Sequence, residues 1–273
     1  MSNKRGLVLV PLLGAGLILS GCPSGKEVEK PAERSSRDGQ TVKMTAKDGL
    51  TVYGQLYSPA EKPRSIAICF HQAGSNSGEY REIAPRLVLR GIACLAVDQR
   101  AGGTMWDQDN RTQKDSGRTD WKYEDAYQDM MAAYEWAKSK GYMKVVVWGS
   151  SYSASLVLRL ANEVPVSAVV AFSPGEYFAN KTQVGDWNAT LSRPSLFAFS
   201  KKEAVDGGFT LYERAPKTLE RKSDVLVLRD DGIHGNSVLL ADKSNPTAAG
   251  YYWKMLFAFF DTQRIGGEAP KSG

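Results

Sequence analysis

The chain has 273 residues, of which 42% are hydrophobic and 24% charged, a balance that allows a sizeable buried core. Its formal net charge is +5 without a concentrated basic stripe, so nucleic acid is not an expected partner. The three cysteines and two histidines form no CxxC motif and no Cys/His cluster, so we expect neither a metal site nor a cofactor.

The first 21 residues have the pattern of an export signal. Lys4 and Arg5 precede an uncharged run, residues 6–21, that ends at Cys22 and is too short for a comfortable membrane span. The end of this run resembles the bacterial lipoprotein signal, in which the cysteine is lipidated and becomes the new N-terminus. We therefore expect a lipid anchor on Cys22 in the cell envelope, and Pro23 favours the outer over the inner membrane. An ordinary signal peptide with a chance cysteine is the alternative.

Residues 22–40 are Lys, Glu, Ser, Pro and Gly with little to bury, which predicts a flexible tether. One globular domain is expected over residues 41–264, followed by a flexible tail over residues 265–273. Loss of the signal segment would lower the net charge from +5 to +3. Cys69 and Cys94 each lie in an apolar run, which predicts buried thiols that neighbouring strands could bring together.

The globular part alternates between strand and helix patterns. The expected strands are Thr51–Tyr57, Ser65–Phe70, Ala93–Val97, Val145–Trp148, Ala168–Phe172, Ser195–Phe199 and Asp224–Leu228. The expected helices are Gly78–Arg90, Tyr123–Lys140, Ser151–Asn162 and Thr247–Arg264. Apolar runs of about five residues are typical of strands covered on both faces, as in parallel sheets. The alternation predicts an α/β fold with a mostly parallel sheet and helices on both faces.

One strand–helix junction has the pattern of a nucleophile elbow. A β-branched run, Val145–Trp148, ends in a glycine and two serines and turns at once into a helical pattern. The apex serine needs small residues two positions before and after it, and Gly149 and Ser153 satisfy this around Ser151. If Ser150 were the apex, Trp148 would stand where a small residue is required. Ser153 lies about half a helical turn beyond the end of the strand. Ser151 is the predicted nucleophile, and the alternative is a serine-rich helix cap.

The elbow and the order of the elements resemble the α/β-hydrolase family across nearly all of Thr41–Arg264, most closely its small esterases and dienelactone-hydrolase-like members. In that family the nucleophile is followed along the chain by the acid and then by the histidine. His234, with Gly235 after it, follows the last expected strand and resembles the general base. An exposed loop histidine is the alternative. His71 lies too far upstream for that place in the order.

The resemblance places the acid of the triad after Ser195–Phe199. The usual spacing from the strand puts Glu203 in this position, where it would orient the imidazole. Asp206 remains an alternative acid. Either residue could instead be a solvated carboxylate in a turn, without a catalytic role. Asp230 and Asp231 are too close to His234 in sequence to be preferred.

The segment from His71 to Ser75 resembles the oxyanion-loop motif His-Gly-x-Gly of the family, with Gln72 where glycine is usual. The resemblance implies that main-chain N–H groups of Gln72 and Tyr152 hold the oxyanion, with Ala73 as the alternative loop donor. In this interpretation His71 is structural and braces the loop through hydrogen bonds.

Two further segments follow the strand Ala93–Val97. Asp98 and Arg100 resemble the Asp-x-Arg-Gly turn of the family, which implies that they tie loops beneath the site. The polar segment Thr104–Trp121 is long for a loop, and long loops at the carboxyl edge of a parallel sheet often bind substrates. Trp106 is therefore a candidate pocket residue, with simple packing as the alternative.

These features predict a serine hydrolase that cleaves an ester-like bond in a small-molecule substrate through an acyl-enzyme. The interval between Phe172 and Pro194 has no room for a large lid domain, so an open pocket is expected. Two alternatives remain: a lipoprotein of this fold that binds without turnover, and an amidase or peptidase that uses the same triad.

Overall fold

The computed structural model describes residues 39–208 and 225–267. The expected signal segment, Cys22 and nearly all of the expected tether lie outside the described residues. Within the described ranges, no helix combines the length and the hydrophobicity that crossing a bilayer requires.

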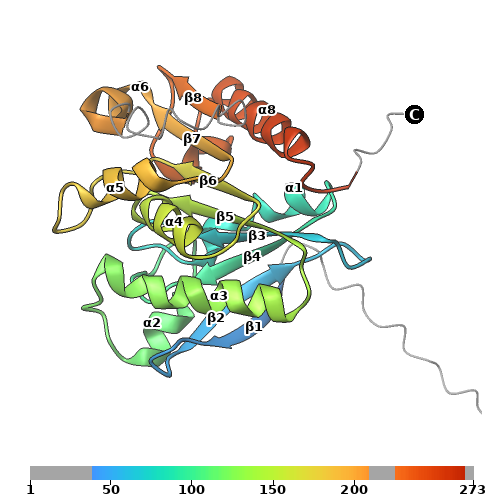
Figure 1. The fold of residues 1–273 in the computed structure, drawn as a ribbon, viewed down its shortest axis with the longest axis vertical. Coiled ribbons are helices and arrows are strands. Elements are labelled where there is room, and N and C mark those ends of the chain that lie inside the picture. The colour runs from blue at the N-terminus through green and yellow to red at the C-terminus, as the bar shows by residue number, and fades with distance from the viewer. Residues whose placement is uncertain (1–38, 209–224, 268–273) are drawn as a thin grey trace, which may run out of the picture. The chain divides into compact units, whose positions relative to one another are not determined.

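A mostly parallel sheet forms the centre of the described part of the chain (Figure 1). Its strands are β1 (Gln40–Thr45), β2 (Thr51–Tyr57), β3 (Ser65–Phe70), β4 (Ile92–Asp98), β5 (Lys144–Ser150), β6 (Ala168–Phe172), β7 (Ser195–Ser200) and β8 (Val225–Arg229). Their order is β1-β2-β4-β3-β5-β6-β7-β8; the pairs β1–β2 and β2–β4 are antiparallel, and all later pairs are parallel. This is the α/β-hydrolase fold that the sequence predicts.

The helices of the described residues connect these strands. They are the 3-10 helix η1 (Ser77–Tyr80), α1 (Ala84–Val88), α2 (Arg111–Ser116), the 3-10 helix η2 (Tyr123–Ala126), α3 (Tyr127–Ser139), α4 (Tyr152–Glu163), α5 (Gln183–Thr190), α6 (Lys201–Glu203) with the π-helical turn η3 (Ala204–Gly208), the 3-10 helix η4 (Gly235–Leu239) and α8 (Pro246–Thr262). Between β6 and β7 the chain forms only a loop and α5, so no lid domain is inserted there.

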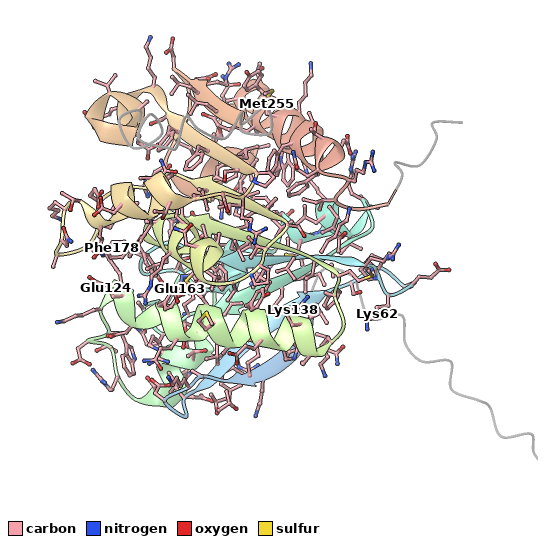
Figure 2. The ribbon with its side chains drawn as sticks, in the orientation of Figure 1. Lys62, Glu124, Lys138, Glu163, Phe178 and Met255 are labelled. Carbon is pink, nitrogen blue, oxygen red and sulfur yellow. The ribbon has the colours of Figure 1, made fainter. Side chains whose placement is uncertain are left out.

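Two hydrophobic cores lie on opposite faces of the sheet. Successive residues of a strand point to opposite faces, so Val145 and Val147 of β5 join the core under α3 and α4, while Val146 and Trp148 join the core under α1 and α8. Side chains fill both layers (Figure 2). Because both faces are covered, the inner strands are continuous apolar runs, which is why the sequence identified them.

The elements that the sequence did not predict are short or polar. β1 is mostly exposed, with Met44 as its one buried residue, so it lacks the continuous apolar run of the inner strands. α2 lies inside the segment expected to be a loop, and it begins after the side-chain cap of Asn110 and ends at the left-handed Gly117. The single helix expected over Gly78–Arg90 is instead two short helices, η1 and α1, and Pro85 lies in the first turn of α1.

The two described cysteines are free and buried, as expected. Cys69 and Cys94 lie on the neighbouring strands β3 and β4, and their Sγ atoms are 3.5 Å apart. Burial raises the pKa of the Cys69 thiol well above its ordinary value, which keeps this thiol protonated and unreactive.

Candidate active site

The nucleophile elbow lies where β5 ends and α4 begins. Ser151, between them, has φ 59° and ψ −125°, a strained conformation for a residue with a side chain. A Cβ at Gly149 would lie 2.4 Å from the main chain of Ser153, so only glycine fits two residues before the apex. The sharp turn can form here because Gly149 has no side chain at the point where the start of α4 comes closest to the end of β5.

Ser153, the other serine considered as the apex, is fully buried and its hydroxyl is already bonded. The Ser153 hydroxyl lies 2.8 Å from the carbonyl of Phe70 and accepts the N–H of Ser150 at 2.9 Å. These bonds fasten the start of α4 to β3 and β5. The main-chain N–H of Ser151 donates to the Phe172 carbonyl at 2.8 Å, but its hydroxyl makes no hydrogen bond to a strand within the described residues. Ser151 lies at the N-terminus of α4, where the helix dipole favours negative charge.

Glu203 and His234 are in contact. The Oε1 atom of Glu203 lies 2.5 Å from Nδ1 of His234. The other carboxylate oxygen accepts the N–H of Ser200 and the hydroxyl of Ser173, both at 2.9 Å. Burial raises the pKa of Glu203, but the hydrogen bonds from His234, Ser200 and Ser173 outweigh it and leave the pKa below its ordinary value. Glu203 is therefore a carboxylate aligned on the imidazole.

Asp206 does not take this place. It lies in the π-helical turn that follows α6, it is exposed, and no hydrogen bond or ion pair within the described residues joins it to His234. Glu203 is held in position by a reciprocal capping box with Ser200 at the end of β7. The turn after β7 thus presents the first of the two candidate acids to the imidazole.

The loop of His234 is fastened to the elbow by main-chain hydrogen bonds. The N–H of Gly235 donates to the Ser173 hydroxyl at 2.9 Å, and the N–H of Asn236 donates to the Ser150 hydroxyl at 3.1 Å. Gly235 has φ 62°, and a Cβ there would lie 2.5 Å from the Ser150 hydroxyl, so the glycine after the histidine permits this close approach. With Nδ1 facing Glu203, Nε2 is the imidazole nitrogen left to accept a proton.

Ser173 and Tyr177, in the loop after β6, also belong to the site, although no sequence signal identified them. Ser173 bridges Glu203 and Gly235 through its hydroxyl. The Tyr177 hydroxyl donates to the Ser173 carbonyl at 2.8 Å and is hydrogen-bonded to Ser151, while burial raises the pKa of this phenol to about 12. Within the described residues, no hydrogen bond joins the Ser151 hydroxyl to His234. Catalytic hydrogen bonds often form only with substrate bound.

The loop that carries Tyr177 is anchored by its next residue. Phe178, labelled in Figure 2, is buried in the core under α4 and packs its ring 5.6 Å from that of Trp187 in α5. A cavity of about 280 Å³ lies beside the loop and is lined by Ser173, Pro174, Gly175, Glu176, Tyr177, Glu203, Asp206 and Gly207. The cavity thus adjoins Glu203 and Tyr177, the residue that is hydrogen-bonded to Ser151.

Trp106 is not among the residues that line this cavity. Its indole N–H donates to the Ser75 hydroxyl at 2.9 Å, and its ring packs against the core under α1 and α8. Within the described residues, no hydrogen bond joins it to Ser151, His234 or Glu203. The pocket role of Trp106 stays a prediction, and the contacts of this structure are those of packing.

The loop after β3 lies beside the elbow because Phe70 of β3 pairs with Gly149 of β5. One expected feature of this loop is wrong: the N–H of Gln72 is not free, since it donates to the buried carboxylate of Glu79 at 2.9 Å. The N–H of Ala73, the alternative donor, has no hydrogen-bond acceptor among the described residues. The N–H of Tyr152 is the first of α4, where no intrahelical acceptor exists.

His71 braces this loop, in agreement with its expected role. Its Nδ1 lies 2.8 Å from the carbonyl of Gln72, and its Nε2 accepts the N–H of Gln99 at 3.0 Å and lies 3.1 Å from the amide of Asn110. Burial lowers the pKa of His71, an effect that the Gln72 hydrogen bond partly opposes, so the neutral imidazole is favoured.

Asp98 and Arg100 tie loops together, as the sequence indicates. Asp98 accepts the N–H of Ser77 at 2.7 Å and that of Arg111 at 3.0 Å. The buried guanidinium of Arg100 pairs with Asp129 at 2.7 Å and with Asp48 at 2.5 Å. The bonds of Asp98 hold η1 and α2 against the end of β4, and those of Arg100 hold α3 and the turn between β1 and β2 to the segment after β4.

Solved structures share this fold at low sequence identity, while no family model matches the chain. An esterase from Pyrococcus furiosus is 16% identical with a TM-score of 0.60, over 84% of this chain and 91% of that chain. A dienelactone hydrolase from Anabaena variabilis is 16% identical with a TM-score of 0.60, over 82% of this chain and 98% of that chain. A thermostable carboxyl esterase from Bacillus coagulans is 12% identical with a TM-score of 0.65, over 83% of this chain and 99% of that chain.

Proposed function

We propose that the protein is a serine hydrolase that cleaves an ester-like bond through an acyl-enzyme intermediate. The observation that carries the proposal is the contact of Glu203 with His234 at 2.5 Å. The His234 loop is hydrogen-bonded to Ser150, next to the strained elbow residue Ser151. A partly buried carboxylate aligned on an imidazole, next to a serine at a helix N-terminus, is the arrangement that activates a hydroxyl for acyl transfer. The similar solved structures include two esterases and a dienelactone hydrolase, which favours an ester as the substrate.

In the proposed mechanism, Ser151 attacks the ester carbonyl while Nε2 of His234 takes the hydroxyl proton. Glu203 holds the imidazole in orientation and stabilises its charged form. The N–H groups of Ala73 and Tyr152 donate to the developing oxyanion. His234 then returns the proton to the departing alkoxide, and a water molecule releases the acyl group by the same steps in reverse roles.

A fluorophosphonate probe tests the nucleophile, because it phosphonylates only an activated serine. We expect the wild-type protein to be labelled, Ser151→Ala to give no labelling, and Ser153→Ala to keep it in the folded fraction, since the Ser153 hydroxyl is fully buried. Labelling is measured by gel fluorescence and by the mass of the modified peptide. A folded wild type that is not labelled would contradict the proposal and favour a binding function for the cavity beside Tyr177.

We further propose that the protein is anchored to the cell envelope by lipid on Cys22. The apolar run and the residues that precede Cys22 support this proposal. Cys22→Ser is expected to move the protein from the membrane fraction to the soluble fraction, because the residue that carries the lipid is lost. Ser24→Ala, two residues further along, is the matched control and should stay with membranes. Immunoblots of the two fractions decide, and a Cys22→Ser protein that still sediments with membranes would rule the anchor out.

A further inference from the structure

Glu79 is a carboxylate in the core that no cation neutralises among the described residues. It lies in η1 with 1% of its surface exposed, and it forms no ion pair with any of the described residues. Burial of a carboxylate without a counter-charge is unfavourable unless hydrogen bonds satisfy it. Both of its oxygens are satisfied: one accepts the N–H of Gln72 at 2.9 Å and the other the side-chain amide of Asn236 at 2.8 Å.

These two donors come from the two loops that flank Ser151. Gln72 belongs to the loop after β3, and Asn236 lies two residues after His234 in η4. Asn236 is itself fully buried, and its side-chain oxygen accepts the indole N–H of Trp148, in the strand that leads to the elbow, at 2.8 Å. Glu79 therefore completes a chain of hydrogen bonds that runs from β5 through the His234 loop to the loop after β3.

Only a carboxylate can make both bonds. A glutamine at this position has one acceptor oxygen, and its NH₂ group would face one of the two donors. An aspartate is shorter by one methylene. The need for two acceptors explains why a charged side chain is retained in a site where burial disfavours it.

The orientation of the Ala73 N–H follows from the two peptide groups around Gln72. In the first, the Gln72 N–H is held by Glu79. In the second, the Gln72 carbonyl accepts from Nδ1 of His71 at 2.8 Å and from the N–H of Ser75 at 3.3 Å. In a planar trans peptide the N–H points opposite to the carbonyl, so the Ala73 N–H is directed away from these donors. The peptides on both sides of Gln72 are thus fixed.

We infer that Glu79 is a positioning residue that sets the Ala73 N–H of the oxyanion loop and the His234 loop in register across Ser151. The inference rests on the proposed serine-hydrolase function and adds a residue to it. Glu79 acts through Gln72 and Asn236 and does not touch the substrate. Its effect is on the transition state, where the oxyanion exists, rather than on binding of the ground state.

Charge and geometry predict opposite results for Glu79→Gln. A negative charge near the oxyanion disfavours it, so neutralising Glu79 would improve oxyanion binding if charge dominated. If position dominates, the displaced Ala73 N–H weakens oxyanion binding. The sign of the change therefore separates the two effects.

The test compares Glu79→Gln with Glu82→Gln, a matched control in which an exposed carboxylate three residues further along is changed. One readout is the inhibition constant of a trifluoromethyl ketone, which forms a tetrahedral oxyanion on serine, measured by competition with the fluorophosphonate probe. The second is kcat and KM for p-nitrophenyl acetate. We expect Glu79→Gln to raise the inhibition constant and lower kcat by about 10- to 100-fold, less than complete loss of an oxyanion donor, with KM within about twofold. Glu82→Gln should match the wild type.

Each other outcome has a defined meaning. A folded Glu79→Gln protein whose inhibition constant is unchanged or lower overturns the positioning role, while labelling of its Ser151 leaves the hydrolase function standing. A wild type that the probe does not label overturns both. If Glu79→Gln fails to fold, Asn236→Ala breaks the same chain at its second link and is expected to lower kcat about tenfold. An unchanged kcat in a folded Asn236→Ala protein then overturns the inference.

Discussion

His234→Ala is expected to lower kcat for an ester by about 10⁴- to 10⁶-fold, with little change in KM. His234→Ala removes the base that Glu203 orients through Nδ1 at 2.5 Å. The Tyr177 hydroxyl, which is hydrogen-bonded to Ser151, cannot replace it at neutral pH, because burial raises its pKa to about 12. The loss is measured as kcat for p-nitrophenyl acetate and as the rate of labelling by the fluorophosphonate probe.

The matched control is Ile233→Ala, which changes the partly exposed neighbour of His234 and should leave kcat near the wild-type value. Circular dichroism would show whether both proteins are folded. A loss of less than about tenfold in a folded His234→Ala protein would exclude His234 as the general base, since removal of one positioned proton-transfer group costs at least ~10²-fold.

Glu203→Gln should lower kcat by about 10³- to 10⁴-fold, and Asp206→Asn should leave it within about twofold. Glutamine keeps the size of the side chain but cannot stabilise the imidazolium, and its NH₂ group can force the wrong tautomer on His234. Asp206 is exposed and makes no bond to the imidazole within the described residues. The opposite ranking of the two variants would transfer the role of the acid to Asp206.

The stability difference between the wild type and Glu203→Gln is expected to depend on pH. The hydrogen bonds to Glu203 hold its pKa below the ordinary value of 4.5, so the ionised carboxylate stabilises the fold above about pH 4.5, and this contribution is lost as the pH falls through the folded-state pKa. The melting temperatures of wild type and Glu203→Gln should therefore converge below pH 4.5. A gap that widens on acidification would contradict the assigned hydrogen bonds.

Local sequence patterns were sufficient to predict the fold and the position of the elbow. Strands covered on both faces must be apolar throughout, and an apex in a strained conformation requires a small residue at Gly149, so both features leave a signal within a few residues. Chain order also placed the two candidate acids, Glu203 and Asp206, after one strand and His234 after the neighbouring parallel strand, but it left open which carboxylate pairs with the imidazole.

Contacts between distant segments decided the remaining features. Gln72 was expected to offer its N–H to the oxyanion, but that N–H donates to Glu79, whose second oxygen binds Asn236 from a loop 157 residues away. Ser173 and Tyr177 reach the site from the loop after β6 without any motif.

The sequence by itself thus determined which residue types stand at the ends of which strands, because secondary-structure periodicity and the strain of the elbow act over a few neighbouring residues. Only the tertiary structure decided which main-chain N–H groups remain free and which carboxylate faces the imidazole. A hydrogen bond between loops depends on atoms brought within about 3 Å by the packing of the whole sheet, and neither propensity nor spacing along the chain encodes that distance.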